Sequence, residues 1–175
     1  MNERENANIV WFDGGDPVNF GDVPKAIDSL LQAGVIAYRR DPERANALFR
    51  QALAADPTQL PAYFCLYKIH AYQNRLDEAL AAAHAGFAEA ARQAGLSEDA
   101  SKWPPQMAPD GPQRFALYTL KAMAFIHLRR DDRREARRLL DILSRLDPTS
   151  AIGWRVVEAL AEGAAAATDR ENKDE

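Results

Sequence analysis

The chain has a single cysteine, Cys65, and three histidines among its 175 residues. One cysteine excludes an internal disulfide framework, and so few thiol and imidazole groups argue against a closed zinc site. Aromatic residues make up only 9% of the sequence, and no apolar run approaches the roughly 18 residues of a membrane-spanning helix. The polar first residues, Met1 to Asn8, lack the basic and apolar regions of a signal peptide. We therefore expect a soluble, cytoplasmic protein.

The chain also has a low net charge and few β-branched residues. The net charge is −4 and the sequence pI is about 5.5, which argues against a dedicated nucleic-acid binder. Val, Ile and Thr together number 17, whereas alanine alone numbers 33. Alanine is the best helix former and β-branched residues favour strands. The composition and length predict one all-α domain.

A repeated pattern runs through the helical part of the sequence. It consists of a small residue followed by small or apolar residues four and seven positions later. One copy is Ala45-Phe49-Ala52, which is followed by Pro57, and another is Ala136-Leu140-Leu143, which is followed by Pro148. A third copy, between them, is Ala79-Ala83-Gly86. Amphipathic stretches precede the three copies, at 26–39, 60–73 and 117–130. Small residues let two helices approach closely and proline ends the second one, so the pattern predicts helix pairs.

These pairs, with Ala45 and Ala79 spaced 34 residues apart, resemble the tetratricopeptide repeat family. Its signature positions are occupied by Tyr63, Leu66, Tyr67, His70, Ala79 and Ala83 in the best repeat, and by Leu120, Met123, Ala124, His127, Ala136, Leu140, Leu143 and Pro148 in the last. The resemblance implies a right-handed α-solenoid of helix hairpins. The repeats would span about 26–59, 60–95 and 117–150, and a capping helix 151–167.

The first repeat matches the family less well in its first helix. Ser29 and Gln32 stand where the family has bulky residues. The same alignment places Ile27 and Gly34 on the face that would line the family's groove.

Three segments fall outside the repeats. The N-terminal arm, 1–25, is predicted to be non-helical because Asp, Gly and Pro surround its aromatic residues; it either covers the first repeat or binds a partner. An insertion at 96–114 is predicted to be a proline-rich loop whose apolar residues, Trp103 and Met107, dock on the domain or form a second partner contact. The charged tail, 168–175, is predicted to be disordered.

No catalytic constellation is present in the sequence. There is no phosphate-binding loop, metal-ligand spacing or activated nucleophile, so we predict no catalytic, cofactor-binding or metal-binding residues and no cofactor. Cys65 is expected to be buried, and His70 and His127, which share a repeat position, are expected to pack between helices. A metal carrier or enzyme using Cys65, His70 and His84 is the alternative. The arginine run Leu128 to Leu140 is interleaved with acidic residues, which predicts ion pairs on a solvated face.

The resemblance implies a concave groove lined by the first helix of each pair. Its aromatic residues would anchor an apolar segment and its cations would attract an acidic or amphipathic segment of a partner protein. Packing under the loop or the arm is the alternative role for these side chains. The implied groove residues are Tyr38, Phe64, Lys68, Tyr72, Tyr118, Lys121, Phe125, Arg129 and Arg155.

The sequence thus favours a non-enzymatic adaptor or assembly factor that binds a protein, with neither nucleic acid nor membrane as partner. A dedicated chaperone for a secreted or assembling client protein is the alternative, as is a maturation or protection factor for a multi-subunit enzyme. The alanine-rich helices fit either an intramolecular stack or a symmetric interface between copies, so the oligomeric state stays open.

Overall fold

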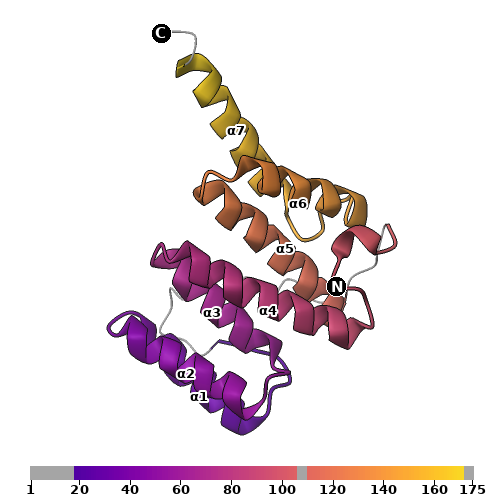
Figure 1. Cartoon of the computed structure of the whole chain (residues 1–175). Coiled ribbons are helices and arrows are strands. Elements are labelled where there is room, and N and C mark those ends of the chain that lie inside the picture. The colour runs from indigo at the N-terminus through magenta and orange to yellow at the C-terminus, as the bar shows by residue number, and fades with distance from the viewer. Residues whose placement is uncertain (1–17, 106–109, 172–175) are drawn as a thin grey trace, which may run out of the picture. The chain divides into compact units, whose positions relative to one another are not determined.

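The structure is a computed structural model that describes residues 18–105 and 110–171 (Figure 1). Within these ranges the chain forms seven α-helices and one short 3-10 helix, without a strand. The predicted all-α class is confirmed. No helix in the described ranges is both long and apolar enough to cross a membrane. The chain divides into two compact units, Met1–Cys65 and Leu66–Glu175.

Unit 1 is built on the packing of α1 (Lys25–Tyr38) against α2 (Pro42–Ala55), and α3 (Leu60–Tyr72) begins in this unit. The start of α2 is capped by the Asp41 carboxylate, which accepts a hydrogen bond from the Arg44 backbone N–H at 2.9 Å. Pro42 occupies the first turn, where a missing N–H costs nothing. The helix ends at Ala55, ahead of Pro57, as the sequence predicts.

The buried side of α1 consists of Ile27, Leu31, Gly34 and Val35. Ser29 is exposed, so it does not hold a core position. The predicted register of this helix is therefore wrong: Ile27 and Gly34, expected on the groove face, pack inward. Gly34 lies against the ring of Phe49 in α2, and a glycine at the crossing is what lets that ring approach the α1 backbone.

Gln32 ties the segment that precedes α1 to the helix. Its side-chain amide donates a hydrogen bond to the Val18 carbonyl at 2.6 Å, and its oxygen accepts one from the Val18 N–H at 3.1 Å. The described end of the predicted arm, at Val18, thus lies on the first helix. Trp11 and Phe12 lie outside the described residues.

In unit 2, α4 (Leu76–Ala94) packs on α5 (Gly111–Arg129), and α5 packs on α6 (Arg133–Leu146) (Figure 1). A last helix, α7 (Arg155–Glu171), contacts α5 and α6. The small residues predicted to lie at helix crossings are fully buried: Ala79, Ala83, Ala124 and Ala136. The small side chains thus lie between the packed helices, where they let the helices approach closely.

The turns that lead into α4 and α6 have the same geometry. The Arg75 N–H donates to the His70 carbonyl at 2.9 Å, and the Asp132 N–H donates to the His127 carbonyl at 2.9 Å. One residue earlier in each turn the backbone is left-handed, with φ of 59° at Asn74 and 61° at Asp131. His70 and His127 are both buried, as expected. The shared geometry supports two equivalent helix-turn-helix units.

The insertion is shorter than predicted because α5 begins at Gly111, inside the segment 96–114. Pro112 lies in the first turn of α5, a position that tolerates proline. Glycine and proline are common both in loops and at helix starts, and the sequence prediction assigned Gly111 and Pro112 to a loop.

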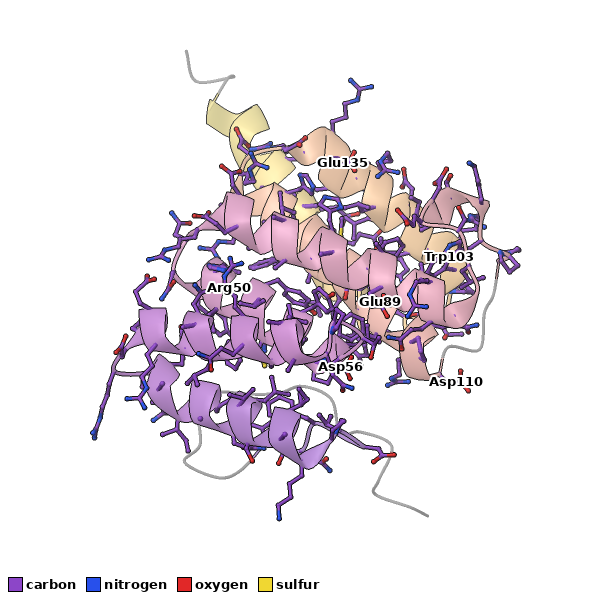
Figure 2. The ribbon with its side chains drawn as sticks, turned by 60° about the horizontal axis from the view of Figure 1, so that its bottom comes forward. Arg50, Asp56, Glu89, Trp103, Asp110 and Glu135 are labelled. Carbon is purple, nitrogen blue, oxygen red and sulfur yellow. The ribbon has the colours of Figure 1, made fainter. Side chains whose placement is uncertain are left out.

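Trp103 is buried and packs on its own unit (labelled in Figure 2). Its ring stacks on that of Phe87 with centroids 5.4 Å apart, and its Nε1–H donates to the Ser97 carbonyl at 2.6 Å. The Arg145 guanidinium also donates to the Trp103 carbonyl, at 2.5 Å. The ring is therefore not accessible as a second partner contact. Met107 lies outside the described residues.

The predicted capping helix is present as α7, with different ends. It begins at Arg155 rather than Ala151 and continues to Glu171, into the segment predicted as a disordered tail. The late start has a local cause, because the buried Asp147 carboxylate accepts the backbone N–H groups of Ala151 at 2.9 Å and Ile152 at 3.0 Å. These bonds hold the residues before α7 in a turn.

Candidate protein-binding surface

One side of α5 alternates cations with aromatic rings. Arg114, Tyr118, Lys121, Phe125 and Arg129 follow one another at intervals of four, three, four and four residues. In an α-helix this spacing places all five side chains on the same face.

Each cation of this stripe lies against a ring. The Arg114 guanidinium carbon is 5.5 Å and the Lys121 Nζ is 4.8 Å from the centroid of Tyr118. The Arg129 guanidinium carbon is 5.9 Å from the centroid of Phe125. These distances fall within the range of cation–π attraction, which fixes the cations close to the helix.

The end of α3 adjoins the same stripe. Arg129 donates hydrogen bonds to the Ala71 carbonyl at 2.7 Å and to Asn74 Oδ1 at 3.1 Å. Next to these acceptors, Tyr72 is 49% exposed, and Phe125 on α5 is 38% exposed. The Lys68 Nζ is 5.6 Å from the Tyr72 ring centroid, so the pairing of cation and ring extends onto α3.

The turn before α7 borders the other part of the stripe. Lys121 Nζ donates to the Ile152 carbonyl at 2.7 Å. Arg155 lies 5.7 Å from the Trp154 ring and donates to the Pro148 carbonyl at 3.0 Å. We call this surface the aromatic–cation face; it comprises Lys68, Tyr72, Arg114, Tyr118, Lys121, Phe125, Arg129 and Arg155.

In the described part of the chain, Arg114, Lys121, Arg129 and Arg155 of the aromatic–cation face form no ion pair with a carboxylate. Although the chain has 26 acidic residues, neither α3 nor α5 contains one. Among the described residues, the hydrogen-bond acceptors of Arg114, Lys121, Arg129 and Arg155 are backbone carbonyls, a hydroxyl and an amide oxygen. A neutral oxygen orients a cation without cancelling its charge. Burial also lowers the pKa of Lys121, because the ammonium is partly desolvated.

Several cations elsewhere in unit 2 are paired with carboxylates. Arg92 lies 2.6 Å from Glu89 on α4, and Arg138 lies 2.5 Å from Glu135 on α6 (Glu89 and Glu135 are labelled in Figure 2). Arg130, at the end of α5, lies 2.8 Å from Asp77. Within the arginine run, Arg133 pairs with Asp131 and Arg138 with Glu135, as its interleaved acids predict. Arg129 of the same run donates only to neutral oxygens.

The predicted groove residues fall in both units. Tyr38, at the end of α1, and Phe64, in α3, are half-buried in unit 1. Burial raises the pKa of the Tyr38 hydroxyl. The other seven lie in unit 2 and belong to the aromatic–cation face. Arg114 was missed because it falls in the segment predicted as a loop; its spacing of four from Tyr118 is the signal that identifies it.

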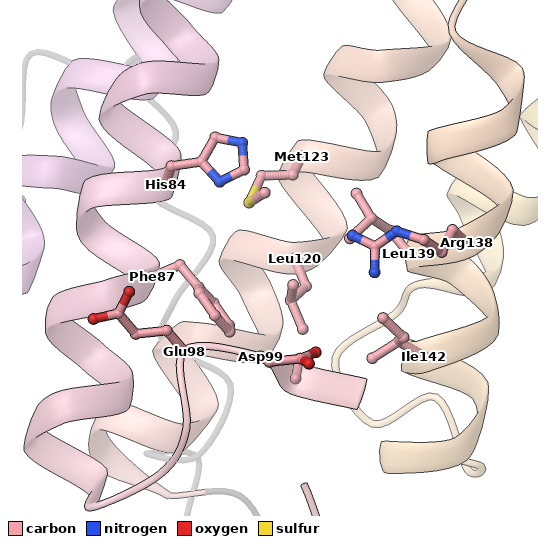
Figure 3. Close-up of a pocket in the computed structure, with 10 residues that line it drawn as sticks. His84, Phe87, Glu98, Asp99, Leu120, Met123, Arg138, Leu139 and Ile142 are labelled. Carbon is pink, nitrogen blue, oxygen red and sulfur yellow. The ribbon is translucent and has the colours of Figure 1, made fainter. Parts of the chain in front are cut away.

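A small pocket of about 90 Å³ lies between α4, α5 and α6 (Figure 3). His84 of α4 and Met123 of α5 point toward one another on one side, and Arg138 approaches from α6. Partial burial, followed by the charges of His127 and Arg138, lowers the pKa of His84. No group of three or more potential metal ligands occurs in the part of the chain that the structure describes. The volume suits a few water molecules.

The chain matches no protein-family model, no curated protein and no solved structure.

Proposed function

We propose that this chain is a non-enzymatic adaptor or assembly factor of the tetratricopeptide type, which binds an acidic segment of a partner protein on the aromatic–cation face. One observation carries the proposal: Arg114, Lys121, Arg129 and Arg155 lie against aromatic rings, and in the described structure only neutral oxygens accept their hydrogen bonds. An acidic partner would supply the missing carboxylates.

Two kinds of contact support such binding. The rings of Tyr72 and Phe125 are exposed and rigid, and aromatic side chains of this kind often dominate the energy of protein interfaces. The fixed cations add attraction that speeds association and selects an acidic surface. Because each cation is held by a ring and an acceptor before binding, little side-chain entropy is lost on association.

The experiment is an affinity capture with the tagged full chain from its own cells, washed at low and at high salt after nuclease treatment. We compare the wild type with Arg114→Gln and Phe125→Ala, and with Arg137→Gln as a matched control for charge. Arg137 is exposed on α6, outside the aromatic–cation face.

We expect one partner that is lost at high salt and in both variants of the face, and that persists in Arg137→Gln. A partner retained equally by all four proteins contradicts the assigned surface. Material that is captured only when the nuclease treatment is omitted identifies a nucleic acid as the ligand and contradicts the proposal.

A further inference from the structure

The residues that carry the charges of the α5 stripe have a fixed spacing along the backbone of the helix. Arg114 and Lys121 are seven residues apart, and Lys121 and Arg129 are eight residues apart. At 1.5 Å per residue these separations are about 10.5 Å and about 12 Å along the helix axis. Tyr118 and Phe125 lie in the two intervals.

This spacing belongs to the folded structure because all three cations are held in place. Arg114 contacts the Tyr118 ring and hydroxyl. Lys121 contacts the same ring and donates to the Ile152 carbonyl. Arg129 bridges the Phe125 ring and the end of α3. Carboxylates that meet these cations must therefore follow the same order along the helix.

A helical partner matches the spacing better than an extended one. Side chains on one face of an extended strand recur about every 6.7 Å, so they fall out of step with residues whose backbone positions are about 10.5 and about 12 Å apart. In a helix, residues seven and eight positions apart are separated by about 10.5 and about 12 Å and share a face. Apolar residues between the acidic ones would then meet Tyr118 and Phe125.

We infer that the partner segment is an amphipathic α-helix that lies along α5. Its acidic residues are at i, i+7 or i+8, and i+15, and its apolar residues are at i+4 and i+11. This inference rests on the proposed function and makes it specific. If the partner helix runs parallel to α5, its middle acidic residue is at i+7, and if it runs antiparallel, that residue is at i+8. The other four positions are the same in both orientations.

The test uses a labelled synthetic helix with Glu at its first, eighth, ninth and sixteenth positions, Leu at its fifth and twelfth, and Ala and Gln elsewhere. Binding to the full chain is followed by fluorescence anisotropy at low salt. One control peptide has the same composition with every Glu moved by two positions, onto the opposite face. A second control has proline at its centre, which breaks the helix.

We expect the matched helix to bind about tenfold or more tightly than either control. Equal binding of the proline peptide means that the partner segment is extended, and overturns the helical inference while leaving the proposed function intact. Equal binding of the shifted peptide means that the face attracts any acidic segment, and overturns the register.

A charge reversal tests the register at one position. The Arg114→Glu protein should remain folded, because an acidic side chain near the N-terminal end of a helix is favourable. It should lose about tenfold in affinity for the matched helix. Replacing one terminal Glu of the peptide by Arg should restore binding, at the first position for a parallel helix and at the sixteenth for an antiparallel one. The register is overturned if Arg at neither position restores binding, or if Arg at both positions restores it equally. If Arg114→Glu and Phe125→Ala leave both peptide binding and partner capture unchanged, the proposed function itself fails.

Discussion

Gly34 and Phe49 are in such close contact that a Cβ atom on Gly34 would lie 2.3 Å from Phe49 Cε1. The same atom would lie 2.7 Å from Cζ and 2.8 Å from Cδ1 of that ring. Phe49 is fully buried, so its ring has little room to move away. The crossing of α1 and α2 therefore depends on the absence of a side chain at Gly34.

We predict that Gly34→Ala destabilises the protein by about 1–3 kcal/mol, the usual cost of overpacking a core. Urea denaturation measures the change. Gly163→Ala is the matched control, because Gly163 is exposed in α7 and a Cβ there meets no atom within 4 Å. That variant should be more stable by about 0.5–1 kcal/mol. An equally stable Gly34→Ala protein would mean that α1 and α2 separate readily.

The left-handed turn at Asn74 gives a second prediction. Asn74→Ala and Asn74→Gly both remove the oxygen that accepts from Arg129. They differ in backbone preference, since only glycine adopts a φ of 59° without steric cost. The Ala variant should be less stable than the Gly variant by about 1–2 kcal/mol. Thermal or urea denaturation of the two variants gives the difference, and equal stabilities would contradict the left-handed geometry.

Arg145 provides a test of how the insertion is held. Its guanidinium donates to the carbonyls of Ala100, Ser101 and Trp103. Arg145→Met should loosen this segment, because the three bonds are lost together. We expect trypsin to cleave after the exposed Lys102 several-fold faster than in the wild type, since local opening limits such cleavage.

Arg137→Met is the control for Arg145→Met, because Arg137 is exposed on the same helix. It should leave the cleavage rate after Lys102 unchanged. Equal acceleration in both variants would point to a general loss of stability in α6.

His84 predicts a dependence of stability on pH. Burial, with the charges of His127 and Arg138, lowers its pKa below the ordinary value of 6.5, and Glu135 opposes this shift. The unfolded chain then binds the proton more tightly than the folded one. The wild type should therefore lose stability as the pH falls from about 7.5 to about 5, and His84→Gln should lose less.

Urea denaturation of both proteins at the two pH values checks this difference. Carboxylates with lowered pKa, such as those of Asp132 and Glu135, also lose stabilising contacts in acid. They do so mainly at lower pH, and they are present in both proteins. Parallel pH profiles of wild type and His84→Gln would contradict the role assigned to His84.

The second helix of each pair was predictable because its pattern is tied directly to packing. Ala45, Ala79 and Ala136 are all fully buried, as small residues at a helix crossing must be. The register of α1 was not predictable in this way. Its crossing uses Gly34, and a glycine in a helix carries no apolar side chain for a pattern to detect.

The aromatic–cation face was predictable in composition and not in its detailed contacts. The family resemblance implied Tyr118, Lys121, Phe125 and Arg129 as groove residues, and their regular spacing places them on one face of α5. The bonds from Lys121 to the Ile152 carbonyl and from Arg129 to the Ala71 carbonyl join residues far apart in sequence. Every residue has a backbone carbonyl, so the sequence does not show which carbonyl accepts a given hydrogen bond. Only the folded structure shows it.

Since α3 and α5 carry no acidic residue, the 26 carboxylates are concentrated on the other segments of a chain whose net charge is −4. At neutral pH the purified protein is an anion overall, and it still presents a local strip of cations. We expect it to be retained at low salt by an anion exchanger and also by a heparin column. Retention on heparin would then report the uneven distribution of charge, and it would not by itself identify a nucleic acid as the natural ligand.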